Sequence, residues 1–266
     1  MIAATGGAAG AAGGRLDMAR ECHIGLAFSS GANDARAMQL PETIVFDLDG
    51  TLVDSAPDLT AALNAALADL GREPVDPPTV RHLAGHGARV LIERGLALRG
   101  VGGEAEVARA LPVFLTYYGA HIADTSLAYP GAEAALNALA AAGCRLAICT
   151  NKPVALAQAL VAALGWSGRF AAILGGESLA VRKPDPAPLL ATIAEAGGDP
   201  ATTVYVGDTD VDVATARAAG VPVVVAGFGF ASGPPSELGG DAVIDHFDAL
   251  LPVLAALQTL PTRDAA

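Results

Sequence analysis

The sequence predicts an α/β protein with a doubly wound parallel sheet and a helical segment inserted after the first strand. Three observations lead to this prediction. Short runs rich in β-branched residues recur along the chain, helical stretches separate most of them, and residues 57–129 contain no strand-like run. Regular alternation of strands and helices is typical of parallel sheets with helices on both faces.

Each expected strand is a short apolar run that ends in turn residues. The first is TIVF at residues 43–46, which Asp and Gly follow directly. Similar runs occupy residues 145–151, 171–176, 202–208, 222–227 and 242–246. Apolar residues at helical spacing fill the segments 131–142, 153–165, 186–197 and 210–219. This pattern therefore predicts successive strand–helix units.

The long segment after the first strand is expected to form a helical domain of its own. Because open α/β sheets bind ligands beyond the carboxyl ends of their strands, a domain inserted there would cover the site as a cap. We expect a catalytic core of residues 41–56 and 130–266 and a helical cap of residues 57–129. Residues 1–40, rich in Ala and Gly, are expected to be a flexible extension.

Composition excludes several classes of protein. The 266 residues carry 16 Lys+Arg against 28 Asp+Glu, a net charge of -12, which disfavours nonspecific binding to nucleic acid. Pro and Gly interrupt the longest uncharged stretch, residues 218–236, so no membrane span is expected. Three cysteines without a CxxC pair, and no signal-peptide pattern, favour reduced thiols in the cytoplasm.

Two carboxylates follow the first strand in the segment DLDGTLVD, residues 47–54. Alternation along a strand places Asp47 and Asp49 on the same side. Two neighbouring carboxylates repel each other unless a cation lies between them or one takes a proton. They therefore predict a metal site, an acid/base pair or both, whereas the alternative is a polar turn without a chemical role.

Three further strand ends carry polar or charged side chains. Thr150 and Asn151 follow one strand, and Lys183 precedes a proline-rich turn. Asp208 and Asp212 follow another. Parallel strands would place all of these groups at one edge of the sheet. Together with Mg²⁺ they would suit phosphoryl transfer with an aspartate as nucleophile.

In the order and spacing of these motifs the chain resembles the haloacid dehalogenase superfamily. The matching residues are DLDGTLVDS at 47–55, Thr150, Lys183 with Pro184, and GDTDVD at 207–212. The resemblance implies a Rossmann-like core with an inserted helical cap. It also implies that Asp47 forms an aspartyl-phosphate, while Asp49 protonates the leaving oxygen and then takes a proton from water.

The same resemblance implies the groups that hold the substrate and the metal. The phosphoryl group would be bound by Thr150 and Lys183, with Asn151 beside them. Asp47, the carbonyl of Asp49 and Asp208 would bind Mg²⁺, with Asp212 as an auxiliary ligand. Superfamily dehalogenases have no acidic residue at the second position, so the presence of Asp49 favours phosphate chemistry.

Within the superfamily the chain resembles the bacterial phosphoglycolate phosphatases. The similar segments are residues 54–59, 82–96, 114–131 and 150–153. This resemblance implies hydrolysis of 2-phosphoglycolate. The sequence leaves open whether the protein is a monomer or homodimer. In the cap, His86 and Arg89 are candidates for contacting the substrate, or else belong to an ordinary polar helix face.

Other functions remain compatible with the same motifs. A phosphatase for sugar phosphates or pyrophosphate would share all of them. A phosphomutase-type isomerase would use the same two aspartates under a helical cap. A phosphate-binding module without activity would need a damaged site, yet every core position is intact.

Overall fold

The computed structural model describes residues 39–100 and 102–258. The extension expected for residues 1–40 lies outside this range except for Gln39 and Leu40, and so does Cys22. Among the residues that are described, no helix combines the length and the apolar character that crossing a membrane requires.

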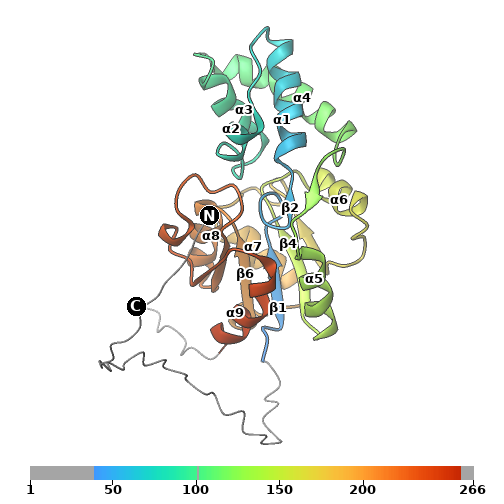
Figure 1. Cartoon of the computed structure of the whole chain (residues 1–266), viewed down its shortest axis with the longest axis vertical. Coiled ribbons are helices and arrows are strands. Elements are labelled where there is room, and N and C mark those ends of the chain that lie inside the picture. Colours follow the sequence, from blue (N-terminus) through green and yellow to red (C-terminus); the bar gives the residue numbers. More distant parts are fainter. Residues whose placement is uncertain (1–38, 101, 259–266) are drawn as a thin grey trace, which may run out of the picture. The chain divides into compact units, whose positions relative to one another are not determined.

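A six-stranded parallel sheet forms the core, which confirms the predicted fold class. Its strands are β1 (Thr43–Phe46), β4 (Arg145–Cys149), β5 (Ala172–Leu174), β6 (Thr203–Gly207), β7 (Val223–Ala226) and β8 (Ala242–Ile244). Their order is β5-β4-β1-β6-β7-β8. Figure 1 labels β4, β1 and β6. Phe46 pairs with Ile148 on β4 and with Val206 on β6. The residues that follow β1, β4 and β6 are therefore neighbours at one edge of the sheet.

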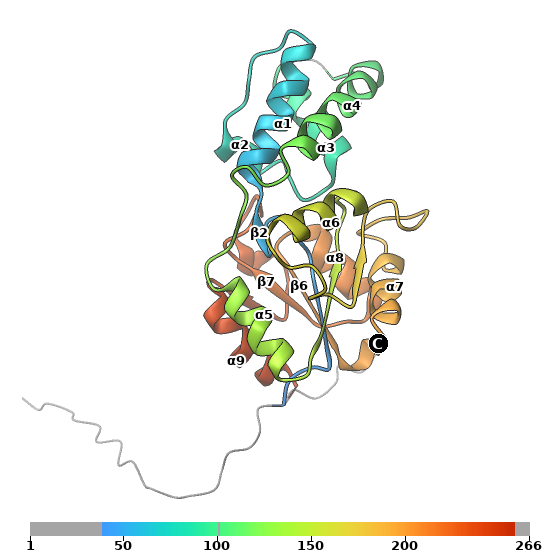
Figure 2. The same cartoon turned by 90° about the vertical axis from the view of Figure 1, so that its right-hand side faces the viewer.

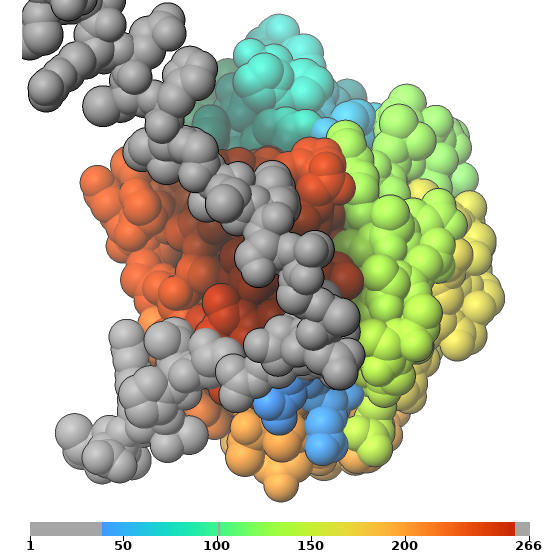
Figure 3. Space-filling view, turned by 60° about the horizontal axis from the view of Figure 1, so that its bottom comes forward, coloured from blue at the N-terminus to red at the C-terminus, as the bar shows by residue number. Residues whose placement is uncertain are grey.

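Helices cover both faces of this sheet (Figure 2). One face packs against α5 (Ala132–Ala141), α6 (Val154–Ala163) and α9 (Leu250–Leu257). The other packs against α7 (Ala187–Glu195) and α8 (Asp210–Ala219). Phe46 belongs to the first apolar cluster and its neighbour Val45 to the second, as strand alternation requires. In Figure 3, α5 in green lies beside the C-terminal segment in red, which includes α9.

Four helices lie between β2 (Val53–Asp54) and β3 (Leu127–Ala128), as Figure 1 shows. Their apolar side chains form a separate cluster. The helices are α1 (Ala56–Asp69), α2 (Pro77–Arg81), α3 (Ala88–Ala97) and α4 (Glu104–Ala120). We call residues 56–120 the helical insertion. Its core includes Leu63, Ile92 and Phe114. Gly95 lets α3 approach α1, because an added Cβ there would lie 2.9 Å from Leu63 Cδ2.

Two chain segments connect the helical insertion to the core. They pair as the antiparallel strands β2 (Val53–Asp54) and β3 (Leu127–Ala128). Asp58, in the first turn of α1, accepts hydrogen bonds from the backbone nitrogens and the hydroxyls of Thr125 and Ser126. These bonds attach the returning segment to the start of α1. Three short 3₁₀ helices, Pro200–Thr202, Pro235–Glu237 and Phe247–Ala249, complete the described elements.

Candidate active site

A sharp turn after β1 carries the two carboxylates that the sequence singled out. Asp47 is 3% exposed, and Asp49 follows at the start of the turn. The turn depends on Gly50, whose φ of +85° is a left-handed conformation that favours glycine. A Cβ on Gly50 would lie 2.2 Å from Asp208 Oδ2. Glycine therefore permits both the turn and its close approach to Asp208.

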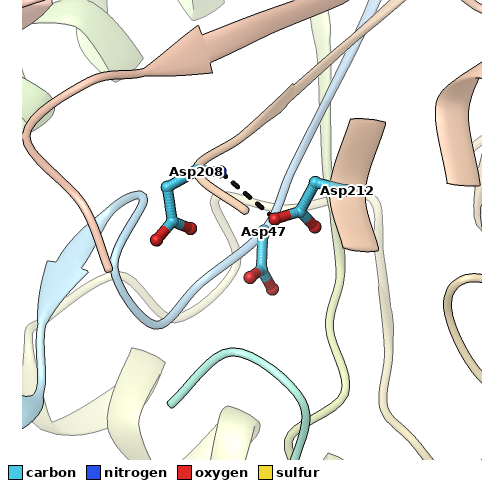
Figure 4. A group of neighbouring side chains, drawn as sticks. All are labelled: Asp47, Asp208 and Asp212. Atoms are coloured by element: carbon cyan, nitrogen blue, oxygen red, sulfur yellow. Dashed lines mark hydrogen bonds between the residues drawn. The ribbon is translucent and has the colours of Figure 1, made fainter. Parts of the chain in front are cut away.

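Three buried aspartates converge where β1 and β6 end (Figure 4). One oxygen from each of Asp47, Asp208 and Asp212 lies within 4.8 Å of the others. Asp212 Oδ2 accepts hydrogen bonds from the backbone nitrogens of Asp208, at 3.2 Å, and Thr209, at 3.0 Å. Asp47 Oδ1 is buried and has no hydrogen-bond partner. We call these three residues the acidic cluster.

Lys183 is the cation beside the acidic cluster. Its Nζ lies 3.1 Å from Asp47 Oδ1, an ion pair without hydrogen-bond geometry. The same Nζ donates to Asp212 Oδ1 at 2.7 Å, to the Tyr205 hydroxyl at 2.8 Å and to the Cys149 carbonyl at 3.0 Å. Tyr205 in turn donates to Asp212 Oδ1 at 2.9 Å. No pattern in the sequence indicated this role for Tyr205, because its place inside a buried strand is typical of packing.

Burial controls the protonation of the acidic cluster. It raises the pKa of Asp47 to about 6, although Lys183 opposes this. Burial and the nearby Asp212 raise the pKa of Asp208 well above its usual value. Burial acts to raise the pKa of Asp212 as well, but Lys183 and Thr209 hold the pKa of that carboxyl below its usual value.

The charge balance and the donor atoms of the cluster fit a divalent metal ion. Three carboxylates and one ammonium would leave two negative charges when all are ionised, three minus one. A divalent cation balances that charge. Asp47 Oδ1 has no hydrogen-bond partner, and all donor atoms of the cluster are oxygens, which suits a hard cation.

Thr150 and Asn151 follow β4 and line the same pocket as Asp47. Thr150 is buried, and its hydroxyl oxygen accepts a hydrogen bond from Lys152 N at 3.2 Å. Asn151 Nδ2 donates to the Lys183 carbonyl at 3.1 Å, and its Oδ1 is buried without a partner. The structure thus places both residues beside Asp47, and the Asn151 amide nitrogen holds the loop that carries Lys183.

Lys152 and Tyr118 surround Asp49, although neither was a candidate from the sequence. Lys152 Nζ donates to the two Asp49 carboxylate oxygens at 2.8 and 3.0 Å and to the Tyr118 hydroxyl at 2.5 Å. Ser55 Oγ donates to Asp49 Oδ1 at 2.6 Å. A lysine directly after Thr150 and Asn151 at a strand end was a usable signal. Tyr118 lies on α4 and gave none, because an aromatic residue at helical spacing usually indicates packing.

The pocket lies between the strand ends and the helical insertion. Its empty space is about 470 Å³, part of it open to solvent. Asp47 and Asp49 line it from the core, and Leu59, Leu91 and Phe114 line it from the helical insertion. Both parts of the chain therefore contribute to one pocket whose wall is charged on the core side and largely apolar on the other.

The loop between α2 and α3 brings the helical insertion into contact with the core. An added Cβ on Gly85 would lie 2.7 Å from Thr209 Cγ2, and one on Gly87 would lie 3.2 Å from the Asn151 carbonyl. Only a residue without a side chain allows this approach at Gly85. The loop thus closes one side of the pocket, whose lining includes both glycines.

His86 and Arg89, the two residues of the helical insertion considered as substrate contacts, do not line the pocket. His86 Nε2 lies 3.7 Å from Asp210 Oδ1 of the core. Arg89 pairs with Glu93 at 3.1 Å and with Glu104. In this structure both side chains therefore face carboxylates of the protein.

Comparison with known proteins agrees with the fold. Residues 41–220 match the haloacid dehalogenase-like hydrolase family, and the chain belongs to this family. The chain is 44% identical over 216 residues to a phosphoglycolate phosphatase of Rhodospirillum rubrum, covering 79% of this chain and 90% of that protein. It is 47% identical over 213 residues to one of Mesorhizobium japonicum, covering 80% and 94%.

A solved structure shows the same likeness. The crystal structure of a predicted phosphoglycolate phosphatase from Haemophilus somnus superimposes with a TM-score of 0.76 at 34% identity, covering 81% of this chain and 99% of that one. The family resemblance seen in the sequence is thereby confirmed. The protein is an enzyme of the phosphoric monoester hydrolase class, similar to phosphoglycolate phosphatases.

Proposed function

We propose that the protein is a Mg²⁺-dependent phosphatase that hydrolyses 2-phosphoglycolate to glycolate and phosphate. The observation that carries this proposal is the buried Asp47, which has an oxygen without a hydrogen-bond partner and lines a pocket together with Asp49. The excess negative charge around it favours a divalent cation. The identity to relatives named phosphoglycolate phosphatase supports the choice of substrate.

The proposed reaction proceeds in two steps at Asp47. First, an oxygen of Asp47 attacks phosphorus and the bond to the ester oxygen breaks, while Asp49 gives its proton to that oxygen and glycolate leaves. Then water attacks the aspartyl-phosphate and gives a proton to Asp49. The bond from phosphorus to Asp47 breaks, phosphate leaves, and both carboxyl groups return to their starting states.

Residues at the neighbouring strand ends would hold the phosphoryl group. Thr150 and Asn151 line the pocket beside Asp47, and the Lys183 ammonium lies 3.1 Å from Asp47 Oδ1. A fixed hydroxyl, amide and ammonium can stabilise the negative charge on phosphoryl oxygens as the transition state forms. Lys183 is anchored by Asp212, so its ammonium needs little rearrangement for this role.

The acidic cluster would hold the metal. We assign Asp47, Asp208 and the Asp49 backbone carbonyl as ligands. Asp212 is auxiliary, because Lys183 and backbone nitrogens already bind its oxygens. When bound, Mg²⁺ supplies positive charge that offsets the carboxylates and the phosphoryl oxygens.

The helical insertion is proposed to act within a cap domain of residues 57–129, over a core of residues 41–56 and 130–266. The shared pocket and the two connecting strands support this division. A cap would keep bulk water away from the aspartyl-phosphate. We also propose that the enzyme works in the cytoplasm, for which the free thiols of Cys144 and Cys149 are suited.

A substrate panel tests the proposed function. Phosphate release is measured with Mg²⁺ on 2-phosphoglycolate, several sugar phosphates, pyrophosphate and pyridoxal phosphate. We expect the highest kcat/KM for 2-phosphoglycolate, and a preference of about tenfold or more for another ester would refute the substrate assignment. Interconversion of sugar 1- and 6-phosphates without net phosphate release would instead identify a phosphomutase.

The role of Asp47 is tested by Asp47→Asn, with Asp69→Asn as the matched control. Asp69 lies on α1, is 47% exposed and pairs only loosely with Arg109 at 3.5 Å. We expect Asp47→Asn to bind the substrate without turning it over and the control to keep full activity. Unchanged turnover in Asp47→Asn would overturn the assignment of the nucleophile.

A further inference from the structure

Lys152 is the one cationic side chain among the residues that line the pocket in the described chain. The other side chains of the lining are carboxylates, small polar groups and apolar groups. A substrate with a carboxylate at the end opposite its phosphoryl group needs a cation to take that carboxylate out of water. The pocket therefore offers a single ammonium for a second anionic group.

The surroundings of Lys152 fix the position of its ammonium. Its three hydrogens point to the two oxygens of Asp49 and to the Tyr118 hydroxyl. The Nζ also lies 4.3 Å from the centroid of the Tyr118 ring, a distance at which the ring attracts a cation. The Lys152 side chain is only 3% exposed. A cation buried this deeply has to keep a carboxylate partner.

We propose that Lys152 binds the carboxylate of the substrate by exchanging it for the carboxylate of Asp49. This inference rests on the proposed function, because it concerns the substrate of the same site. Two substrate oxygens would replace two Asp49 oxygens, so the ammonium keeps the same number of hydrogen bonds and still has a carboxylate as its partner. Tyr118 holds the ammonium in place during the exchange.

The exchange links recognition of the substrate to the position of Asp49. Asp49 keeps its bond from Ser55 and is released from Lys152 toward the pocket that it already lines. An ester without a second anionic group leaves Asp49 bound to Lys152. Lys152 thereby favours substrates that carry a carboxylate.

Other cations near the pocket are engaged elsewhere. Arg89 pairs with two glutamates of the helical insertion. Arg81 pairs with Asp54 and donates to the Tyr129 hydroxyl at 3.3 Å. Lys183 is occupied by the acidic cluster. None of these three lines the pocket.

The test compares two esters that differ in the carboxylate. The kcat and KM for 2-phosphoglycolate and ethyl phosphate are measured with Mg²⁺ in the wild type, Lys152→Met and Lys152→Arg. The control is Arg109→Met, which removes an exposed cation from α4. The informative quantity is the ratio of the two kcat/KM values, because a general loss of folded enzyme lowers both esters equally and cancels.

We expect Lys152→Met to lower this ratio by about 10- to 100-fold, mainly through the KM for 2-phosphoglycolate, because hydrogen bonds to a charged group are lost. Lys152→Arg should restore part of the ratio, and Arg109→Met should not change it. Tyr118→Phe keeps the ring but removes the hydroxyl, so we expect a smaller fall of about 3- to 10-fold.

An equal loss for both esters in Lys152→Met would overturn the proposal, since Lys152 would then act only through Asp49 or the fold. A fall of the ratio in Arg89→Met but not in Lys152→Met would also overturn it. If the wild type prefers a different ester that has a second anionic group, the assignment of 2-phosphoglycolate as substrate is wrong. The role of Lys152 is then tested by the same comparison between that ester and its analogue without the second anionic group. A wild type that prefers ethyl phosphate would refute both.

Discussion

Replacing Asp47 by asparagine removes a buried carboxyl group. Burial raises the pKa of this group from an ordinary value of 3.8 to about 6. A carboxyl with a higher pKa in the folded state favours folding while it is protonated. Its stabilising contribution is complete below pH 3.8 and is lost as the pH rises through about 6. Without metal, the wild type should therefore lose stability relative to Asp47→Asn as the pH rises across this range.

The size of the effect follows from the shift. A difference of about two pKa units corresponds to about 3 kcal/mol in the free energy of unfolding. About 1 to 2 kcal/mol of this should disappear between about pH 5 and 7.5, because the unfolded chain is already ionised at pH 5. The pKa of Asp208 is also raised, but Asp208 is present in both proteins, so its own contribution cancels in their difference. The lowered pKa values of Asp58 and Asp212 act below pH 3.8 and leave this window unaffected.

Urea denaturation in EDTA at several pH values measures this quantity for the wild type, Asp47→Asn and the exposed control Asp69→Asn. We expect the stability of the wild type minus that of Asp47→Asn to fall by about 1 to 2 kcal/mol from about pH 5 to 7.5. The difference between the wild type and the control should stay constant. A flat or rising difference for Asp47→Asn would refute the reasoning about burial.

Three further perturbations test other parts of the site. Gly50→Ala places a Cβ 2.2 Å from Asp208 Oδ2 in a left-handed backbone, so we expect urea denaturation to show a loss of about 1 to 3 kcal/mol in the free energy of unfolding. Calorimetry should also show weaker Mg²⁺ binding, and unchanged binding would argue against Asp208 as a ligand. Asp58→Asn weakens the hydrogen bonds from Thr125 and Ser126, so we expect denaturation near neutral pH to show a loss of about 1 to 3 kcal/mol in the free energy of unfolding. An unaltered denaturation midpoint would contradict this expectation. Lys183→Met leaves the buried acidic cluster without its cation, so thermal melting in EDTA should show a loss of about 3 to 5 kcal/mol in the free energy of unfolding, which added Mg²⁺ partly restores. A variant as stable as the wild type in EDTA would contradict this account.

The fold class could be predicted from the sequence because it depends on local patterns. The run TIVF at residues 43–46 is apolar and β-branched, and both faces of the sheet bury it. The helical spacing in residues 104–120 likewise indicates a helix, although Pro112 lies inside it. Periodicity of this kind is a property of neighbouring residues and needs no knowledge of the tertiary structure.

The meeting of strand-end residues could also be anticipated, because parallel strands place their carboxyl ends at one edge. The structure brings Asp47, Thr150, Lys183 and Asp208 together there, after strands that are far apart in sequence. Topology alone supplies this neighbourhood. It does not supply the pairing of side chains within it.

Those pairings were decided by the tertiary structure. Lys152 and Asp49 are separated by 103 positions, and Lys152 and Tyr118 by 34, so no local pattern relates them. Arg89 was a sequence candidate for the substrate, but packing of α3 beside α4 brings it to Glu104 instead. By itself, the sequence determined the order of strands and helices and the kinds of chemical group at the strand ends, because hydrophobic period and turn residues act locally. Only the tertiary structure decided which charges face one another, because burial forces each ionised group to find a partner among whatever side chains the packed helices bring within reach.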